Sequence, residues 1–316
     1  MHIELSAILT LEHQGMRLDA AAAMLFPNYS RTRLQSWIES GELLLDNQEA
    51  KAKDKVKENQ MIDIDAELID VQTDLPEPMD LEIVFEDEHL LIVNKPAGLV
   101  VHPAVGNSTG TLLNGLLHHL PKSAQIPRAG IIHRLDKDTS GLLMVAKTIE
   151  AQLKLTEMLK EHDISRHYLA ITNGVLPSSF TINARIGRHP TDRTKMAVLV
   201  AKGLGKEAIT HCEVIERFSQ HTLIEARLET GRTHQIRVHM AHKKFPLLGD
   251  PLYGPRTFVP KNANAETIEQ FRNFKRQALC AYALFLDHPI TGEPLEFEIS
   301  LPPDMQAILD TLQKFG

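Results

Sequence analysis

A short polar, proline-rich stretch, Asp74-Leu75-Pro76-Glu77-Pro78, divides the sequence into two parts of unequal length. Segments of this composition typically connect domains, because few contacts between packed elements cross them. A chain of 316 residues with 43% hydrophobic content can bury one large core and one small core. We therefore predict a small domain with its linker over residues 1–75 and a larger domain over residues 80–316.

The smaller part has the pattern of two short helices followed by two strands. An alanine-rich helix is expected over residues 16–26 and ends where a proline follows. A second helix is expected from its N-cap Ser30 to Gly41, which supplies a C-terminal stop. Its apolar residues recur at helical spacing: Leu34, Trp37 and Ile38. Residues 42–47 and 60–64 then have the pattern of two paired strands.

Short β-compatible runs dominate the larger part. The first two, at residues 81–85 and 90–93, flank an acidic turn and are typical of a hairpin. Later runs have the same character: 142–146, 168–171, 208–214 and 223–228. One helix is clear, because four apolar residues fall on one helical face: Ala151, Leu155, Met158 and Leu159. Since the strands outnumber the helices and do not alternate regularly with them, we predict an α+β domain with a mainly antiparallel, mixed sheet.

Charge is unevenly distributed along the chain. The formal net charge of -7 disfavours a nucleic-acid partner at first sight, because phosphate contacts supply much of the affinity for RNA. The acid is mostly N-terminal, however: residues 1–79 hold 7 Lys+Arg and 15 Asp+Glu. Residues 181–245 hold 12 Lys+Arg, 6 Asp+Glu and six of the sixteen histidines. This basic region suits an anionic ligand.

No sequence signal indicates a membrane, a disulfide framework or a zinc ribbon. No run of eighteen apolar residues occurs, and the N-terminus lacks the basic and apolar segments of a signal peptide. Cys212 and Cys280 are far apart and have no ligand-like spacing. We therefore expect a cytoplasmic protein whose two cysteines are ordinary thiols.

The densest polar cluster is GIIHRLDKDTSGL, from Gly130 to Leu142, between an apolar lead-in and the next strand. Such a loop can present a carboxylate at a sheet edge. It can equally be a turn in which Asp136 or Asp138 bonds its own backbone, and periodicity does not decide between these interpretations. A kinase catalytic loop is excluded, because Leu135 separates the arginine from the aspartate and no glycine-rich loop or Walker lysine precedes it.

A second polar cluster, ETGRTHQIRVHM, begins at Glu229. Here Thr233 can cap a helix on which His234, Arg237 and Ala241 share one face, and an exposed helix N-terminus with basic residues is suited to phosphate. The alternatives are a solvated basic helix and a metal site. The metal site would use His234, His239 and His242. Their spacing does not bring the three imidazoles together on a regular helix, and the His-Glu-x-x-His arrangement is absent.

Four ordered motifs resemble those of the RluA-type pseudouridine synthases. They are NKPAGLVVHP, HRLDKDTSGL, ETGRTHQIRVH and LDHPITGE, and the likeness spans residues 80–303. Residues 14–70, with arginines Arg31 and Arg33 near the start of the second expected helix, resemble the S4 RNA-binding domain. The resemblance implies the α+β pseudouridine synthase catalytic domain behind a small S4-like domain.

The resemblance also implies a reaction. Pseudouridine formation cleaves the N-glycosidic bond, rotates the freed uracil and rejoins it to the ribose through carbon 5. The family aspartate, matching Asp136, is essential, either as the nucleophile at the ribose or as the base that produces a glycal. The family arginine that pairs with it matches Arg237, whose guanidinium would keep a desolvated carboxylate ionised. The family tyrosine that stacks on the base matches Tyr168.

Reaching the glycosidic bond requires turning the nucleotide out of its stack. Arg134 is a candidate to fill the vacated space. Candidates for RNA contacts are Arg31, Arg33, Arg188, Arg193, Lys195, Arg232 and His234. Cys280 departs from the family, since relatives often have histidine there, and this puts only a peripheral contact in doubt.

The implied substrate is uridine in a stem-loop of large-subunit (23S) ribosomal RNA, either free or in a precursor of the subunit. We expect a monomer that needs no cofactor and no metal ion. The alternative hypotheses are a ribosome-associated RNA-binding protein without catalytic activity and, more remotely, a metal-dependent hydrolase. A protein that only binds RNA does not require Asp136, Tyr168 and Arg237 together.

Overall fold

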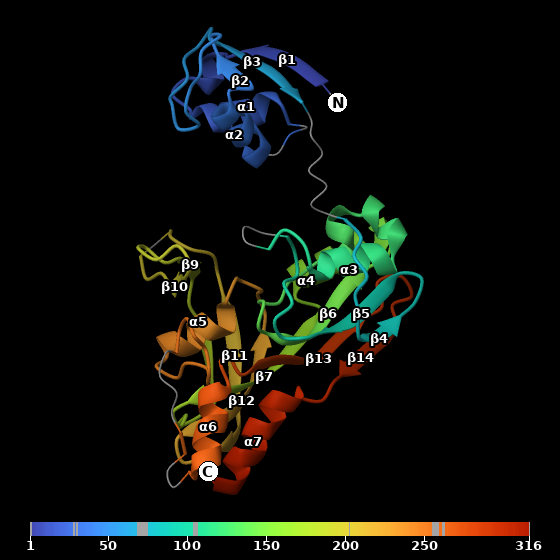
Figure 1. The fold of residues 1–316 in the computed structure, drawn as a ribbon, viewed down its shortest axis with the longest axis vertical. Coiled ribbons are helices and arrows are strands. Elements are labelled where there is room, and N and C mark those ends of the chain that lie inside the picture. The colour runs from blue at the N-terminus through green and yellow to red at the C-terminus, as the bar shows by residue number, and fades with distance from the viewer. Residues whose placement is uncertain are drawn as a thin grey trace. The chain divides into compact units, whose positions relative to one another are not determined.

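The computed structural model describes residues 2–27, 29, 31–67, 75–103, 107–201, 203–254, 259–260 and 263–315. The chain divides into two units, Met1–Gln72 and Thr73–Gly316 (Figure 1). Each unit has its own hydrophobic core. The expected N-cap Ser30 and the first linker residue, Asp74, lie outside the described residues. None of the described helices has the length and apolar character needed to span a membrane.

The N-terminal unit packs two helices on a three-stranded antiparallel sheet of order β1-β3-β2. Its elements are β1 (His2–Ile8), the 3-10 helix η1 (Leu11–His13), α1 (Leu18–Leu25), α2 (Arg31–Ser40), β2 (Leu43–Leu45) and β3 (Met61–Glu67). The two expected helices and the expected strand pair are confirmed. Strand β1 was not predicted, although Ile3, Leu5 and Ala7 alternate with polar residues as in a half-buried strand.

The core of this unit follows from the helical spacing of its apolar residues. Leu18, Leu34 and Trp37 are all nearly inaccessible and pack with Ile62 and Ile64 of β3. These contacts join both helices to the sheet, so the unit has a hydrophobic core of its own.

The C-terminal unit is built on a nine-stranded sheet. Its strands are β4 (Ile83–Glu86), β5 (Leu90–Lys95), β6 (Ser140–Ala146), β7 (Ser165–Asn173), β8 (Phe180–Asn183), β11 (Ile209–Arg217), β12 (His221–Leu228), β13 (Leu279–Asp287) and β14 (Pro294–Glu298). The order is β4-β5-β6-β13-β7-β12-β11-β8, with β14 also paired to β13. Strands β6 and β13 run parallel and the other neighbours run antiparallel, so the predicted mainly antiparallel, mixed sheet is confirmed.

Helices cover this sheet. They are α3 (Leu112–His119), α4 (Ile149–Glu161), α5 (Gln235–His242), α6 (Ala265–Asn273) and α7 (Pro303–Phe315), with 3-10 helices η2 (Pro121–Gln125) and η3 (Pro127–Gly130) and a two-stranded hairpin β9 (Ile186–Arg188) and β10 (Met196–Val198). Buried residues of α3 and α5 share one core cluster with alternate residues of the central strands, whereas α4, α6 and α7 pack in two other clusters. Every residue of β6 is therefore buried, because both faces of this strand are covered.

The helix expected around residues 151–159 is α4. The Thr148 side chain caps it by accepting a hydrogen bond from the backbone N–H of Ala151, and His162 ends it in a left-handed conformation. Ala151 and Leu155 are fully buried, with Met158 and Leu159 packed beside them, as the spacing predicted.

Candidate active site

Asp136 lies in the loop that leads from η3 into the central strand β6. The carboxylate has 14% of its side-chain surface exposed, and its hydrogen bond goes to Arg237 rather than to its own backbone. A turn bond does occur in the loop, where the backbone N–H of Thr139 donates to the Asp136 carbonyl. For Asp136 the interpretation as a side chain that serves only the turn is therefore wrong.

Gly141 determines how the loop meets the sheet. It pairs with Ala281 where β6 and β13 run parallel, and its φ is 118°. A Cβ atom here would lie 2.2 Å from the carbonyl oxygen of Ala281, so only glycine fits. The glycine that closes the HRLDKDTSG segment thus lets the loop enter the middle of the sheet, five residues after Asp136.

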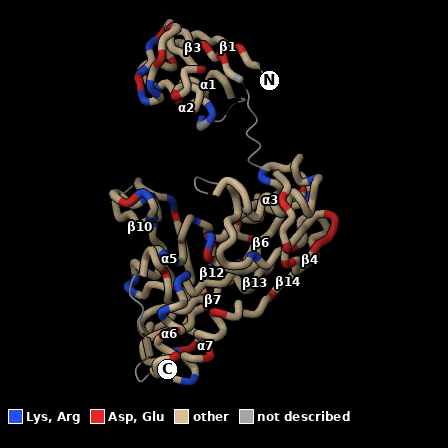
Figure 2. The backbone as a smooth tube through the Cα atoms, in the orientation of Figure 1, with Lys and Arg blue, Asp and Glu red and all other residues tan. Residues whose placement is uncertain are grey.

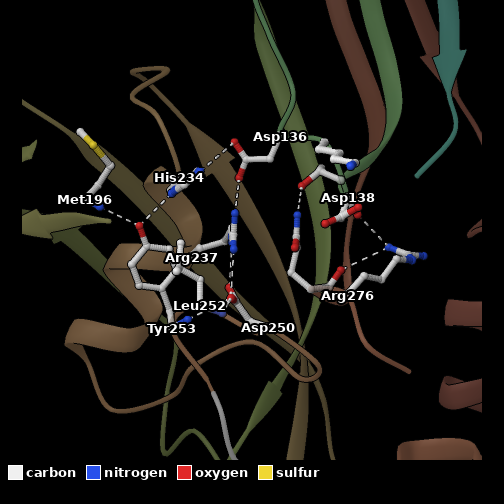
Figure 3. A network of polar contacts seen from close by, with 12 residues as sticks. Asp136, Asp138, Met196, His234, Arg237, Asp250, Leu252, Tyr253 and Arg276 are labelled. Atoms are coloured by element: carbon white, nitrogen blue, oxygen red, sulfur yellow. Dashed lines mark hydrogen bonds and ion pairs between the residues drawn. The ribbon is translucent and has the colours of Figure 1, made fainter. Parts of the chain in front are cut away.

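Arg237, on α5, joins two carboxylates (Figure 3). Its Nη1 donates to Oδ2 of Asp136 at 2.9 Å, and its Nε and Nη2 donate to the two oxygens of Asp250 at 2.8 and 3.0 Å. Burial would lower the pKa of Arg237, but the hydrogen bonds and charge of Asp250, together with the charge of Asp136, raise it above its usual value. The guanidinium is therefore a permanent cation beside Asp136.

Asp250 was not predicted from the sequence. Its side chain is fully buried, and Oδ1 also accepts the backbone N–H groups of Leu252 and Tyr253. The available signal was an aspartate in a short segment between two glycines, Gly249 and Gly254. That pattern indicates a turn, which Asp250 does make, and gives no indication that the same carboxylate binds Arg237.

His234 and Tyr253 complete the network around Asp136 (Figure 3). The hydroxyl of Tyr253 is 2.8 Å from Nδ1 of His234 and accepts the backbone N–H of Met196, while the Tyr253 ring packs 5.1 Å from the guanidinium carbon of Arg237. Nε2 of His234 lies 3.9 Å from Oδ1 of Asp136. Burial is the main cause that lowers the pKa of His234, so the imidazole is neutral at neutral pH.

The expected start of helix α5 is wrong. The helix begins at Gln235 with His234 as N-cap, in a left-handed conformation of φ 57° and ψ 24°, and no side chain caps it. Gln235, Ile236 and Arg237 are buried, so this first turn is not the exposed phosphate site that a cap at Thr233 implied. Instead, the left-handed N-cap brings the imidazole toward Asp136.

A cleft of about 820 Å³ opens beside Asp136. Tyr168 of β7 lines it, with 5% of its surface exposed. Burial raises the pKa of Tyr168, so its phenol is protonated at neutral pH. The cleft thus has an aromatic wall close to a carboxylate and is large enough for a nucleotide.

Lys95, from the NKPAG segment, binds the loop that carries Asp136. No role for this residue was predicted from the sequence. It is 1% exposed, and its ammonium donates to the carbonyls of Pro96, Leu99 and Lys137 at 2.8 to 2.9 Å. Burial lowers the pKa of Lys95 to about 7. In the sequence Lys95 is visible only as a lysine at the end of an apolar strand. Its contact with Lys137 could not be predicted, because the two residues are 42 positions apart.

The candidate RNA-contacting residues occupy three places. Arg134, Arg232 and His234 line the cleft. Arg188, Arg193 and Lys195 lie in the β9–β10 hairpin, outside that lining, where Figure 2 shows basic residues close together. Arg31 and Arg33 lie on α2 of the N-terminal unit.

Arg31 is not simply solvated. With Arg17 and Gln35 it binds Asp19, whose carboxylate is fully buried, and its Nη2 lies 2.9 Å from Oδ2. These hydrogen bonds lower the pKa of Asp19 against the effect of burial. Arg31 therefore has a structural partner as well as an exposed portion.

Two of the histidines considered as metal ligands, His234 and His239, have other partners. His239 is hydrogen-bonded to Thr210 and to the Ala184 carbonyl, and His234 to Tyr253. Across the described part of the chain, no three His, Cys, Asp or Glu side chains are grouped to hold a metal ion. Cys280 is a free, buried thiol on β13.

Known proteins resemble this chain over nearly its whole length. A family model described as RNA pseudouridylate synthase matches residues 89–242, and the S4 domain model matches residues 16–62. The chain is 49% identical over 312 residues to "Ribosomal large subunit pseudouridine synthase D" of Pseudomonas aeruginosa, covering 99% of this chain and 97% of that protein. It is 48% identical over 301 residues to the protein of the same name from Xanthomonas campestris, covering 95% and 90%. The solved structure of human RNA Pseudouridylate Synthase Domain Containing 1 matches with a TM-score of 0.52 and 25% identity, over 75% of this chain and 97% of that one.

Proposed function

This chain belongs to the RNA pseudouridine synthase family, and on that premise we propose that it isomerises uridines of large-subunit (23S) ribosomal RNA to pseudouridine. The names of relatives that align over nearly the whole chain support this substrate. The observation that carries the chemistry is the Asp136–Arg237 ion pair at the wall of a nucleotide-sized cleft beside Tyr168. Such a trio has no purpose in a protein that only binds RNA, so the non-catalytic alternative is set aside.

Asp136 supplies the reacting oxygen. Its Oδ2 is held by Arg237, whereas Oδ1 has no hydrogen bond to any described residue and lies 3.9 Å from Nε2 of His234. We assign Oδ1 as the atom that acts on the ribose when the N-glycosidic bond breaks. A glycosidase needs a second carboxylic acid to protonate an alkoxide. Uracil is a better leaving group, so a single carboxylate suffices.

Arg237 keeps that carboxylate ionised and oriented. A flipped nucleotide excludes water from Asp136, and desolvation favours the neutral acid unless a cation lies close. The guanidinium supplies the cation and a planar fork of donors, of which one N–H is donated to Asp136 and two are donated to Asp250. Lysine has the charge without the fork.

Tyr168 supports the uracil while the glycosidic bond is open. Its ring offers an aromatic face to the freed base, which must stay bound as it rotates. The phenol remains protonated and neutral, because burial raises its pKa.

Basic residues bring the RNA to the cleft. Extruding the uridine costs a few kcal/mol, which phosphate contacts offset. We assign Arg134 to the space left by the flipped base and phosphate contacts to Arg188, Arg193, Lys195 and Arg232. His234, the other candidate RNA contact in the cleft, has a neutral imidazole that faces Asp136. In the S4 domain Arg31 and Arg33 are the candidate contacts. We further propose that the protein acts as a cytoplasmic monomer, without a metal ion or cofactor, on rRNA or its subunit precursor.

Mapping pseudouridines in 23S rRNA tests the function. Ribosomal RNA from cells without this protein is compared with RNA from cells that express it, by a chemical method specific for pseudouridine. We expect modified positions to be lost in the first sample and restored by re-expression. Identical maps would refute both the activity and the substrate.

A further inference from the structure

Arg166 is a buried arginine without an acidic partner. It is 8% exposed, its Nε is inaccessible and without a hydrogen bond, and no described residue forms an ion pair or a side-chain hydrogen bond with its guanidinium. Arg237, Arg227 and Arg276, by contrast, each bind at least one carboxylate. A buried charge without a counter-ion is unfavourable. The folded chain therefore keeps a cation for which it supplies no anion.

The direction of this side chain follows from the strand that carries it. Arg166 and Tyr168 are two residues apart on β7, so they stand on the same face of the sheet, and both line the cleft. His167 between them points the other way, where its Nδ1 lies 2.6 Å from Oε1 of Glu225. The Arg166 guanidinium thus belongs to the cleft wall.

The wall is shaped around the guanidinium. Gly231, in the loop before α5, lies so close that an added Cβ would be 2.9 Å from Nη1 of Arg166. His133 lines the same cleft, and the charge of Arg166 adds to burial in lowering the pKa of that imidazole. Burial also lowers the pKa of Arg166 itself, as expected where no carboxylate offsets the charge. The neighbouring residues restrict the position of the guanidinium but do not neutralise its charge. An anion that neutralises it would have to enter through the cleft.

We propose that Arg166 binds a phosphate of the RNA backbone next to the flipped uridine, and so forms a phosphate subsite inside the cleft. This inference rests on the proposed function. The residue stands about 7 Å along the strand from Tyr168, which is within the span of one nucleotide. A phosphodiester is the anion that RNA brings there, and a guanidinium fork matches its two free oxygens. A uracil carbonyl is neutral and would leave the charge uncompensated.

The test compares Arg166→Gln with Arg227→Gln. Arg227 lies on the neighbouring strand β12, outside the cleft lining, and its charge is already matched by Glu213 and Glu225. Binding of a 23S rRNA fragment is measured over a range of salt concentrations. We expect Arg166→Gln to raise Kd about ten-fold or more and to lower the salt slope of log K by about one. Arg227→Gln keeps the wild-type slope. Equal slopes for the two variants would overturn the proposal.

Two further measurements separate binding from folding. Because an uncompensated charge is removed, Arg166→Gln without RNA has a melting temperature equal to or above that of the wild type; a fall of several degrees would show that the guanidinium serves the fold. Arg166→Lys keeps the charge and therefore the salt slope, with weaker affinity. Wild-type conversion of the same fragment is measured in parallel. If the wild type does not convert uridine in this fragment, the proposed function is refuted. The dependence of RNA affinity on salt would still decide whether Arg166 binds a phosphate.

Discussion

Arg237 is the residue on which the site geometry depends. One guanidinium holds the carboxylate of Asp136 on one side and is held by the buried carboxylate Asp250 on the other. Its contact with Tyr253, which in turn bonds His234, fixes the plane of the fork. The position of Asp136 therefore depends on a chain of contacts that reaches Asp250 and Tyr253, which lie outside the lining of the cleft.

Asp250→Asn tests this support. The amide keeps one acceptor and loses the charge, so Arg237 becomes less well fixed, and we expect kcat to fall about ten- to a hundred-fold with little change in KM. Leaving a buried guanidinium partly uncompensated also lowers the free energy of unfolding by about 3 kcal/mol. Asp304→Asn, at the half-exposed Arg276–Asp304 pair, is the matched control. Wild-type kcat in Asp250→Asn would show that Arg237 needs no second carboxylate.

Arg237→Lys tests the fork itself. Lysine retains the positive charge, but a single ammonium cannot bind both Asp136 and Asp250 in the observed geometry. We expect a folded protein whose pseudouridine formation is at least about a hundred-fold slower. Circular dichroism checks the fold and a single-turnover assay checks the rate. Turnover like that of the wild type would mean that charge alone is enough.

The loop that carries Asp136 is joined by hydrogen bonds to β6 and to Lys95 at the end of β5. The Lys95 ammonium holds the carbonyl of Lys137, and Nε2 of His133 accepts the backbone N–H of Met144 in β6. Accepting that bond requires a neutral imidazole. Burial, with the charge of Arg166, lowers the pKa of His133 to about 3. The attachment of the loop to β6 therefore depends on pH.

The stability of the protein should show this dependence. His133 titrates near 6.5 in the unfolded chain and near 3 in the fold, so its contribution is complete above pH 6.5 and is lost as the pH falls toward 3. The loss is up to about 1.4 kcal/mol per pH unit. The free energy of unfolding in urea, measured from pH 4 to pH 7, should depend less on pH for His133→Gln than for the wild type. His118→Gln, on an exposed position of α3, is the control. Parallel profiles for all three proteins would contradict this account.

The whole chain joins two units with separate cores. The S4 domain carries the acidic excess of the sequence but also Arg31 and Arg33, while the catalytic unit contains the complete cleft. Catalysis and substrate selection can therefore be separated.

Removing residues 1–72 tests this separation. We expect residues 73–316 to fold, to retain activity on a short stem-loop and to bind intact 23S rRNA at least about ten-fold more weakly, because two linked binding modules gain avidity over one. Thermal unfolding, affinity and the map of modified positions are measured for both forms. Unchanged affinity and selectivity in the shorter form would make the S4 domain dispensable.

Sequence patterns predicted the parts of the molecule that depend on local periodicity. The helices around Trp37 and Leu155 and the mainly antiparallel sheet follow from residues close in the chain. The site depends on contacts across long separations: Asp136 and Arg237 are 101 residues apart, and Lys95 and Lys137 are 42 apart. Motif resemblance supplied the first pair, and nothing local indicated the second.

Two residues of the site, His234 and Asp250, have roles that the sequence did not predict. A cap at Thr233 was expected because threonine is a common N-cap, but His234 takes that position with a left-handed backbone that its residue type does not reveal. Asp250 was overlooked because an aspartate beside glycine usually serves a turn. Both residues adopt these roles through tertiary contacts, since His234 faces Asp136 and Asp250 binds Arg237 of α5.

The most direct test measures pseudouridine formation by Asp136→Asn under single-turnover conditions at saturating RNA, beside Asp138→Asn from the same loop. Both substitutions remove one negative charge, but only Asp136 is bound to Arg237 at the cleft. We expect Asp136→Asn to lose on the order of a thousand-fold or more in rate with RNA affinity within about three-fold of wild type, since phosphate contacts are untouched, and Asp138→Asn to remain active. Conversion by Asp136→Asn at the rate of the Asp138→Asn control would contradict the central role of this carboxylate.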